Sequence, residues 1–223
     1  TTMRHFTPTS PLRRTLCAGI AAVALSVLCL PAAHAQSYPN KPIKFVVPFS
    51  AGSATDSVGR IVAQAMSEAW GQPITIENKA GANGILGAEA VKAAPADGYT
   101  FLVTTSTTQA ANVHLYRKLP YDPVKDFAPI GKIGEVGFIL MVNNDFPAKD
   151  MKEFVSYAKA HPGKLAYGHG SSGSLVSAAM LTELAGLQTV GVPYKSIPPA
   201  LTDLLGGQIQ FAFADTGNAV SQM

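Results

Sequence analysis

The chain has 223 residues, of which 47% are hydrophobic and 14% are charged, a composition typical of a soluble globular protein of one or two domains. Its formal net charge of +3 comes from three arginines near the N-terminus, because its other basic residues are balanced by 14 acids. The chain therefore lacks the basic surface of a nucleic-acid-binding protein, and after residue 35 it has no apolar run long enough for a membrane helix.

Residues 1–35 have the pattern of a secretory signal peptide. Three arginines are followed by an uncharged run from Leu16 to Leu30, and Ala33-His34-Ala35 is a small-x-small cleavage site. The pattern predicts an exported chain that begins at Gln36 and is not inserted in the membrane after cleavage.

Two other export signals match this segment less well. A twin-arginine route would use Arg13-Arg14, and lipidation would use Cys29, but the residues beside both positions fit these signals poorly. Cys17 and Cys29 are removed with the segment, so the exported protein is expected to have no disulfide.

Strand-length apolar runs alternate with amphipathic stretches in the first half of the remaining chain. The predicted elements are strand 43–49, helix 57–69, strand 74–77, helix 84–94 and a buried strand at 99–105. This βαβαβ order predicts a parallel sheet with helices on both faces.

The second half of the chain repeats this alternation. The predicted elements are strand 138–142, helix 151–160, strand 165–167, helix 175–185, strand 190–194, helix 199–205 and strand 209–214. Two such blocks predict an α/β fold with two lobes, 36–137 and 138–223, on either side of a cleft. Strand 138–142 is the expected crossing point.

Each block contains one loop of small residues between a strand and a helix. The first is VVPFSAGSATDSVGR at 46–60, and the second is LAYGHGSSGSLVSAA at 165–179. The first N–H groups of a helix lack internal partners and carry about half a positive charge, and small side chains let a ligand approach them. Because such loops lie at the carboxyl ends of parallel strands, they predict a site for an anion.

The same loops also have a structural interpretation. Small residues turn the chain, and Thr55, Asp56 and Ser174 are ordinary N-cap residues. Asp56 has three candidate roles: it caps the helix, orders the loop, or accepts a hydrogen bond from a ligand, and capping is favoured. His169 lies inside the second loop, where simple exposure is favoured over ligand contact.

The motifs of enzymes are incomplete in this chain. The glycines at 81, 84 and 87 are spaced GxxGxxG rather than GxGxxG, and residue 174 is serine where a nucleophile elbow around Ser172 needs glycine. The histidines after residue 35 lack metal-ligand spacing. We therefore expect no catalytic activity, no cofactor and no metal. A serine hydrolase using Ser172 or Ser174 is a disfavoured alternative, since no motif places a general base.

Several ordered segments between residues 38 and 215 resemble the solute-binding proteins of tripartite tricarboxylate transporters, also called Bug receptors. They are YPNKPIKFVVPFSAGSATDSVGR, NKAGANGILGAEAVKAAPADGYT, DFPAKDMKEFVSYAKAHPGKLAYGHGSSGS and VPYKSIPPALTDLLGGQIQFAFAD. The resemblance implies a two-lobed "Venus flytrap" receptor, monomeric and periplasmic, that closes on a small carboxylate and delivers it to membrane permease subunits. A binding protein of another importer, or a periplasmic sensor, is the alternative.

The resemblance also implies a set of ligand-binding residues. The ligand class stays open between dicarboxylates, tricarboxylates, amino acids and aromatic acids. The implied residues are Phe49, Ser50, Ala51, Gly52, Ser53, Ala54, Thr55, Asp56, Asn83, Ser106, Thr107, His169, Gly170, Ser171, Ser172, Gly173, Ser174, Tyr194, Lys195 and Asp215.

This chain departs from the family pattern in two ways. It has Ser53, Asn83 and Ser196 where the family usually has glycine, and it ends soon after Asp215, well before the family's usual end. The resemblance implies that a return strand to the first lobe is missing. A 223-residue chain is therefore expected to be less stable, and to bind ligand more weakly, than a longer version.

The expected binding mechanism does not use an arginine clamp. After residue 35 the arginines are Arg60 and Arg117, and neither lies in a loop of small residues. Backbone N–H groups and hydroxyls, with bridging water, are therefore expected to hold the carboxylate. Lys195 either adds a cation or is a solvated surface lysine.

Overall fold

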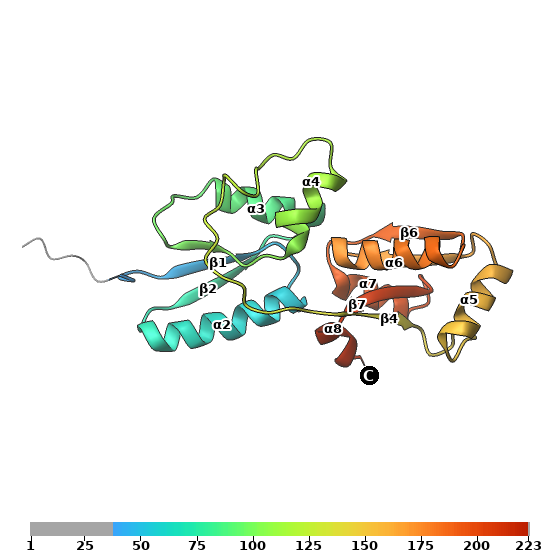
Figure 1. The fold of residues 1–223 in the computed structure, drawn as a ribbon. Coiled ribbons are helices and arrows are strands. Elements are labelled where there is room, and N and C mark those ends of the chain that lie inside the picture. Colours follow the sequence, from blue (N-terminus) through green and yellow to red (C-terminus); the bar gives the residue numbers. More distant parts are fainter. Residues whose placement is uncertain (1–37, 223) are drawn as a thin grey trace, which may run out of the picture. The chain divides into compact units, whose positions relative to one another are not determined.

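The first sheet of the computed structural model, which describes residues 38–222, is parallel as predicted. It has the strand order β2-β1-β3 (Figure 1). The strands are β1 (Ile43–Val47), β2 (Ile74–Asn78) and β3 (Thr100–Leu102). The predicted signal peptide at 1–35 lies outside the described residues.

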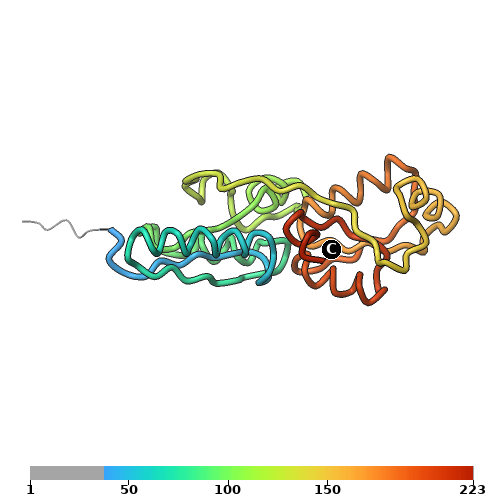
Figure 2. The backbone as a smooth tube through the Cα atoms, turned by 90° about the horizontal axis from the view of Figure 1, so that it is seen from below, coloured from blue at the N-terminus to red at the C-terminus, as the bar shows by residue number. Residues whose placement is uncertain are grey.

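Helices cover both faces of this sheet, as expected from the βαβαβ order. Ile43, Phe45 and Val47 of β1 pack with Ala63 of helix α2 (Ala54–Trp70). On the other face, Leu102 packs with helix α3 (Ile85–Lys92). Figure 2 shows α2 lying along the strands. Alternation along and just after β3 thus places Phe101 and Val103 on the α2 side of the sheet and Leu102 on the α3 side.

The second sheet has the order β4-β7-β5-β6 and is mixed. Its strands are β4 (Phe138–Val142), β5 (Leu165–His169), β6 (Thr189–Pro193) and β7 (Phe211–Asp215). β5 is parallel to both β6 and β7, but the edge strand β4 is antiparallel to β7. The second block is therefore not a simple copy of the first.

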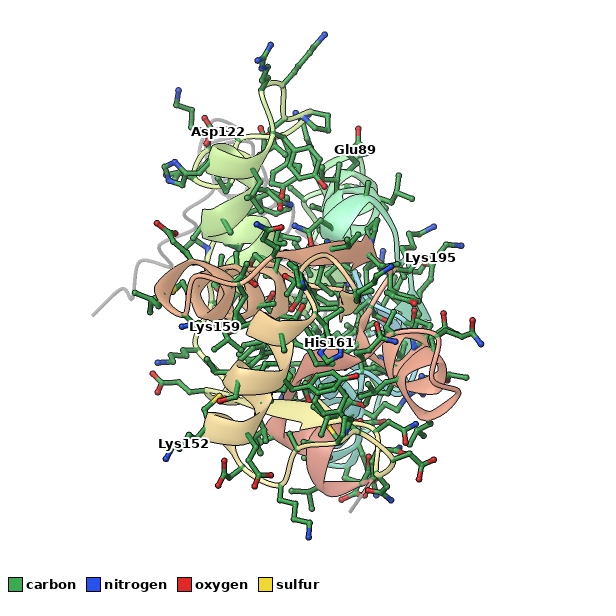
Figure 3. The ribbon with its side chains drawn as sticks, turned by 90° about the vertical axis from the view of Figure 1, so that its right-hand side faces the viewer. Glu89, Asp122, Lys152, Lys159, His161 and Lys195 are labelled. Atoms are coloured by element: carbon green, nitrogen blue, oxygen red, sulfur yellow. The ribbon has the colours of Figure 1, made fainter. Side chains whose placement is uncertain are left out.

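Alternate residues of β7 divide the core of the second sheet between two pairs of helices. Phe211 packs with α5 (Met151–Ala160) and α6 (Ser172–Leu184). Ala212 and Ala214 pack with α7 (Ile197–Leu205) and α8 (Thr216–Val220). Lys152 and Lys159 extend from the exposed side of α5 (Figure 3). The alternation of phenylalanine and alanine along β7 thus places the large side chains on the α5 and α6 face and the small ones on the α7 and α8 face.

Several predicted boundaries differ from the structure. Strand β1 ends two residues before its predicted end, and the expected buried strand at 99–105 is only Thr100–Leu102, which is half-buried. A 3-10 turn (η1, Ala82–Gly84), a π-helical turn (η2, Thr107–Ala111) and helix α4 (Asn112–Leu115) were not predicted. Residues 39–223 form one compact unit, so the predicted division at residue 137 stays a prediction.

Candidate ligand-binding site

The loop after β1 leads directly into α2 and is closed by its own hydrogen bonds. Ser53 N–H donates to the carbonyl of Ser50 at 3.1 Å, and Gly52 has a φ of +78°, a conformation that glycine adopts without strain. Ser53 is the N-cap, since its hydroxyl accepts from Asp56 N–H at 3.3 Å. The prediction that Thr55 or Asp56 caps this helix is wrong, because the helix begins earlier, at Ala54.

The carboxylate of Asp56 ties the loop to its surroundings. It accepts from Gly52 N–H at 3.0 Å, from two nitrogens of Arg60 at 2.9 and 3.0 Å, and from the Asn78 amide at 2.8 Å. The same amide also donates to the carbonyl of Phe49 at 3.0 Å. Asp56 therefore orders the loop, which was the second of its three candidate roles.

Asp56 stays ionised although its residue is only 2% exposed. Burial acts to raise the pKa of Asp56, but the hydrogen bonds from Arg60, Asn78 and Gly52 outweigh it and hold the pKa below the usual value. The Arg60 guanidinium, half-exposed, supplies the opposite charge on the next turn of α2. Arg60 and Asn78 were not predicted as site residues, although the Asp–Arg spacing of four residues was a usable signal.

The first turn of α2 leaves two N–H groups available. Ala54 and Thr55 occupy the first two helical positions, which have no intrahelical acceptor. Within residues 38–222, neither N–H has a loop or side-chain acceptor. Ala51 and Gly52 are exposed, while Ser50, Ala54 and Thr55 are half-buried. The N–H groups of Ala54 and Thr55 thus have no partner in the loop, whereas Phe49, Ser53 and Asp56 are buried beneath it, and anion binding at this turn stays a prediction.

The second loop begins α6 with a reciprocal cap. The Ser171 hydroxyl accepts from Ser174 N–H at 3.3 Å, and the Ser174 hydroxyl accepts from Ser171 N–H at 3.1 Å. Ser174 also accepts from Gly170 N–H at 3.1 Å and is fully buried. Ser171 is thus the N-cap, and the prediction of Ser174 in that position is corrected by three residues.

The glycines of the second loop allow close packing of the chain on itself. A Cβ on Gly170 would lie 2.1 Å from the Ser196 backbone, and a Cβ on Gly173 would lie 2.3 Å from the Phe138 ring. The packing of the protein therefore requires glycine at positions 170 and 173, and ligand contact by this loop stays a prediction.

Thr107 and Ser172 bring the segment after β3 to the start of α6. Their hydroxyls are 2.9 Å apart, and Ser172 N–H donates to the Thr107 hydroxyl at 3.2 Å. Both residues are buried, whereas Ser106 is exposed. The Ser172 hydroxyl is thus paired with another hydroxyl, which is no general base at neutral pH.

Asn83 belongs to a buried amide network. It has a φ of +55°, and its side-chain amide donates to Asn112 at 2.9 Å, while Asn112 donates back to the Asn83 carbonyl at 3.1 Å. Asn112 also donates to the Tyr121 hydroxyl at 3.2 Å, which donates to the Thr108 carbonyl. Asparagine tolerates this left-handed backbone conformation better than most other side chains. The network fixes the unpredicted η2 turn beside Thr107.

The polar residues expected near the second loop mostly have internal partners. The Tyr194 hydroxyl donates to Asp203 at 2.7 Å, and burial together with this carboxylate raises the pKa of Tyr194 to about 12. The Asp215 carboxylate caps α8 through Asn218. His169 ends β5, and burial lowers its pKa, so the ring is neutral at pH 7. Lys195 is exposed (Figure 3).

Residues 38–222 contain neither a metal-binding cluster nor a membrane-spanning helix. No cluster of three histidine, cysteine, aspartate or glutamate residues in this part of the chain could hold a metal ion. No helix in it is both long and apolar enough to cross a membrane.

Comparison with known proteins gives consistent matches. The model of the tripartite tricarboxylate transporter family receptor, TctC, matches residues 58–223. BugT of Bordetella pertussis is 36% identical over 180 residues, which cover 78% of this chain and 55% of BugT. R. palustris Rpa4515 with adipate has a TM-score of 0.78 at 34% identity, covering 80% of this chain and 60% of that chain. MatC from Rhodopseudomonas palustris with bound malate has a TM-score of 0.77 at 38% identity, covering 82% and 63%.

The two α/β sheets and these structural matches define a protein of the periplasmic-binding-protein class. The chain belongs to the tripartite tricarboxylate transporter receptor family, TctC, and the resemblance seen in the sequence is confirmed. It spans between 55% and 63% of the length of the three proteins named.

Proposed function

We propose that this chain is a periplasmic receptor that captures a small organic carboxylate and delivers it to a tripartite tricarboxylate-type transporter. The observation that carries the proposal is the half-buried turn at the start of α2, where the N–H groups of Ala54 and Thr55 have no acceptor within residues 38–222. Solved relatives with adipate and malate support a carboxylate as the ligand.

The N–H groups supply both hydrogen bonds and a favourable field. A hydrogen bond to a charged group contributes about 1.5 to 3 kcal/mol, and the aligned peptide dipoles add attraction for an anion. Because micromolar affinity corresponds to about 8 kcal/mol, a few such bonds are enough after the entropic cost of association. The loop after β5 is proposed to hold the other end of a two-ended acid, mainly through Gly173 N–H, Ser171 and bridging water.

Isothermal titration calorimetry of the 223-residue chain with succinate, malate, adipate and citrate tests the proposal, with neutral succinamide as the control. We expect at least one acid to bind at micromolar concentration, and succinamide not to bind. If none of the acids binds, the proposal fails. Hydrolysis of simple esters that is lost in Ser172→Ala would instead support the enzyme alternative.

A proline substitution tests the α2 turn without disturbing the helix. Ala54→Pro removes the N–H at the first helical position, where proline is well tolerated, and Ser53 already has the extended backbone that precedes proline. We expect the dissociation constant to rise at least tenfold with an unchanged melting temperature. Met151→Pro makes the same change at the first position of α5 and should leave binding unchanged. Equal affinity of Ala54→Pro and the wild type would exclude this N–H as a ligand contact.

A further inference from the structure

We propose that Asp56 is a positioning residue of the α2 turn and not a ligand contact, and that the receptor therefore selects carboxylic acids without an ammonium group. This inference rests on the proposed function, and it narrows a ligand class that the sequence leaves open to amino acids.

All the hydrogen-bond acceptor positions of the Asp56 carboxylate are occupied. A carboxylate offers about four lone-pair positions. Four donors occupy them: Gly52 N–H and Arg60 Nε on Oδ2, and Arg60 together with Asn78 on Oδ1. The residue is also buried, so an incoming ammonium would have to displace Arg60 or Asn78. Arg60 is placed by α2 and Asn78 by the end of β2, whereas Gly52 lies in the loop itself.

The network explains what Asp56 does for the loop. Its bond to Gly52 N–H fixes the residue next to the N-cap, and the Asn78 amide bridges Asp56 to the carbonyl of Phe49 near the start of the loop. Both ends of the segment 49–52 are thus held from α2 and β2. The direction of the Ala54 and Thr55 N–H groups depends on this loop, so Asp56 acts on a ligand through them.

The carboxylates of Asp215 and Asp203 also accept hydrogen bonds from other residues of the protein. Asp215 accepts from Asn218 N–H at 3.0 Å and from the Asn218 side-chain amide through both carboxylate oxygens. Asp203 accepts from the Tyr194 hydroxyl. Hydroxyl and carbonyl oxygens remain, but they carry no net charge to balance an ammonium. The N-terminal ends of α2 and α6 carry partial positive charge, which disfavours a cation there.

Matched ligands that differ by one ammonium group test the selectivity. We expect the 223-residue chain to bind succinate at least tenfold more tightly than L-aspartate, and glutarate at least tenfold more tightly than L-glutamate, by calorimetry at pH 7. If an amino acid binds as tightly as its matched acid, the selectivity is refuted. Malate and L-aspartate, which differ by a hydroxyl in place of the ammonium, form a third pair with the same expected difference.

Substitution of Asp56 separates positioning from contact. Asp56→Asn weakens its hydrogen bonding to Arg60, so a positioning role predicts that succinate and L-aspartate lose affinity by the same factor. A contact with the ammonium predicts a selective loss of L-aspartate, which would overturn the proposal. Arg60→Met leaves the acid in place but removes two of its donors, and it should also weaken succinate binding. Glu68→Gln, an exposed acid on α2, is the matched control.

A measurement without ligand keeps this inference separate from the proposed function. The Gly52 amide should show a large change of its proton chemical shift in ¹H–¹⁵N spectra of Asp56→Asn, and no change in Glu68→Gln. If no acid binds at all, the proposed function fails but the Gly52 signal still tests positioning. An unchanged Gly52 signal in both Asp56→Asn and Arg60→Met would refute the positioning role.

Discussion

Three serines are the N-caps of helices, but only two of their hydroxyls have a hydrogen-bond partner. Ser53 and Ser171 each accept a hydrogen bond from an N–H of the first turn of the helix. Ser196 is buried, and its hydroxyl has no partner within residues 38–222. The sequence of α7 explains why the Ser196 hydroxyl has no partner. An N-cap hydroxyl bonds the second or third N–H of its helix, and in α7 those positions are Pro198 and Pro199, which have none.

Removing the Ser196 hydroxyl should therefore not destabilise the protein. A buried polar group without a partner costs about 1–3 kcal/mol, so Ser196→Ala is expected to leave the free energy of unfolding unchanged or raise it by up to about 1 kcal/mol. Ser171→Ala is the matched control and should lower it by about 1 kcal/mol. Urea unfolding measures both. A loss of stability in Ser196→Ala equal to that in Ser171→Ala would contradict the prediction.

His169 makes stability depend on pH near neutrality. Burial lowers its pKa in the folded state, so the unfolded chain binds the proton more readily, beginning near the ordinary value of 6.5. Stability should be fully present above pH 6.5 and decline as the pH falls below it. His169→Gln should flatten this decline, measured by urea unfolding at pH 8, 7, 6 and 5. An identical pH profile in the variant would contradict the prediction; the carboxylates whose pKa values are lowered act in a more acidic range.

At the scale of elements, the packing of α7 against the second loop depends on Gly170. Gly170→Ala would place a Cβ 2.1 Å from a backbone carbon of Ser196, and backbone atoms move less easily than a side-chain end. We expect a loss of about 1–3 kcal/mol in unfolding free energy, typical of overpacking. Gly131→Ala, where the Cβ meets nothing within 4 Å, should be neutral. Equal stability of the two variants would show that the loop relaxes freely.

Elements with strong local signals were predicted well. Strand 138–142 and helix 151–160 match the structure at both ends. Helices α2 and α6 begin three residues before their predicted starts because the apolar pattern begins after the cap, and their N-caps are Ser53 and Ser171. The η2 turn, TTQAA, was not predicted because it has no side-chain cap and is too short to show a helical apolar pattern. Long-range bonds from Asn112 and Tyr121 hold it instead.

At the scale of the whole molecule, the family and the two sheets could be predicted, but the roles of site residues could not. The two loops were found from their small residues and their position after strands. What each residue does depends on partners far along the chain, such as Asn78 for Asp56 and Ser196 for Gly170. The antiparallel direction of β4 is likewise absent from its local sequence, since it follows from how the chain enters the second sheet.

The Thr107–Ser172 pair joins parts of the chain that lie 65 residues apart. Thr107 follows the last strand of the first sheet, and Ser172 begins a helix that covers the second. Both residues are buried, and the pair acts in this structure as a link between these segments. The Thr107 hydroxyl also satisfies Ser172 N–H, one of the free donors of the α6 turn.

A double-mutant cycle tests this link. Thr107→Val keeps the shape of the side chain but leaves Ser172 N–H without a partner, so we expect a loss of about 1–3 kcal/mol in unfolding free energy. Ser172→Ala should cost less, since the N–H can still donate to Thr107. The double variant should lose less than the sum of the two, with a coupling of about 0.5–1.5 kcal/mol by urea unfolding. Ser106→Ala, at the exposed neighbouring position, should be near neutral. Strictly additive losses would mean that the two hydroxyls act independently and that the segments after β3 and before α6 are held together by other contacts.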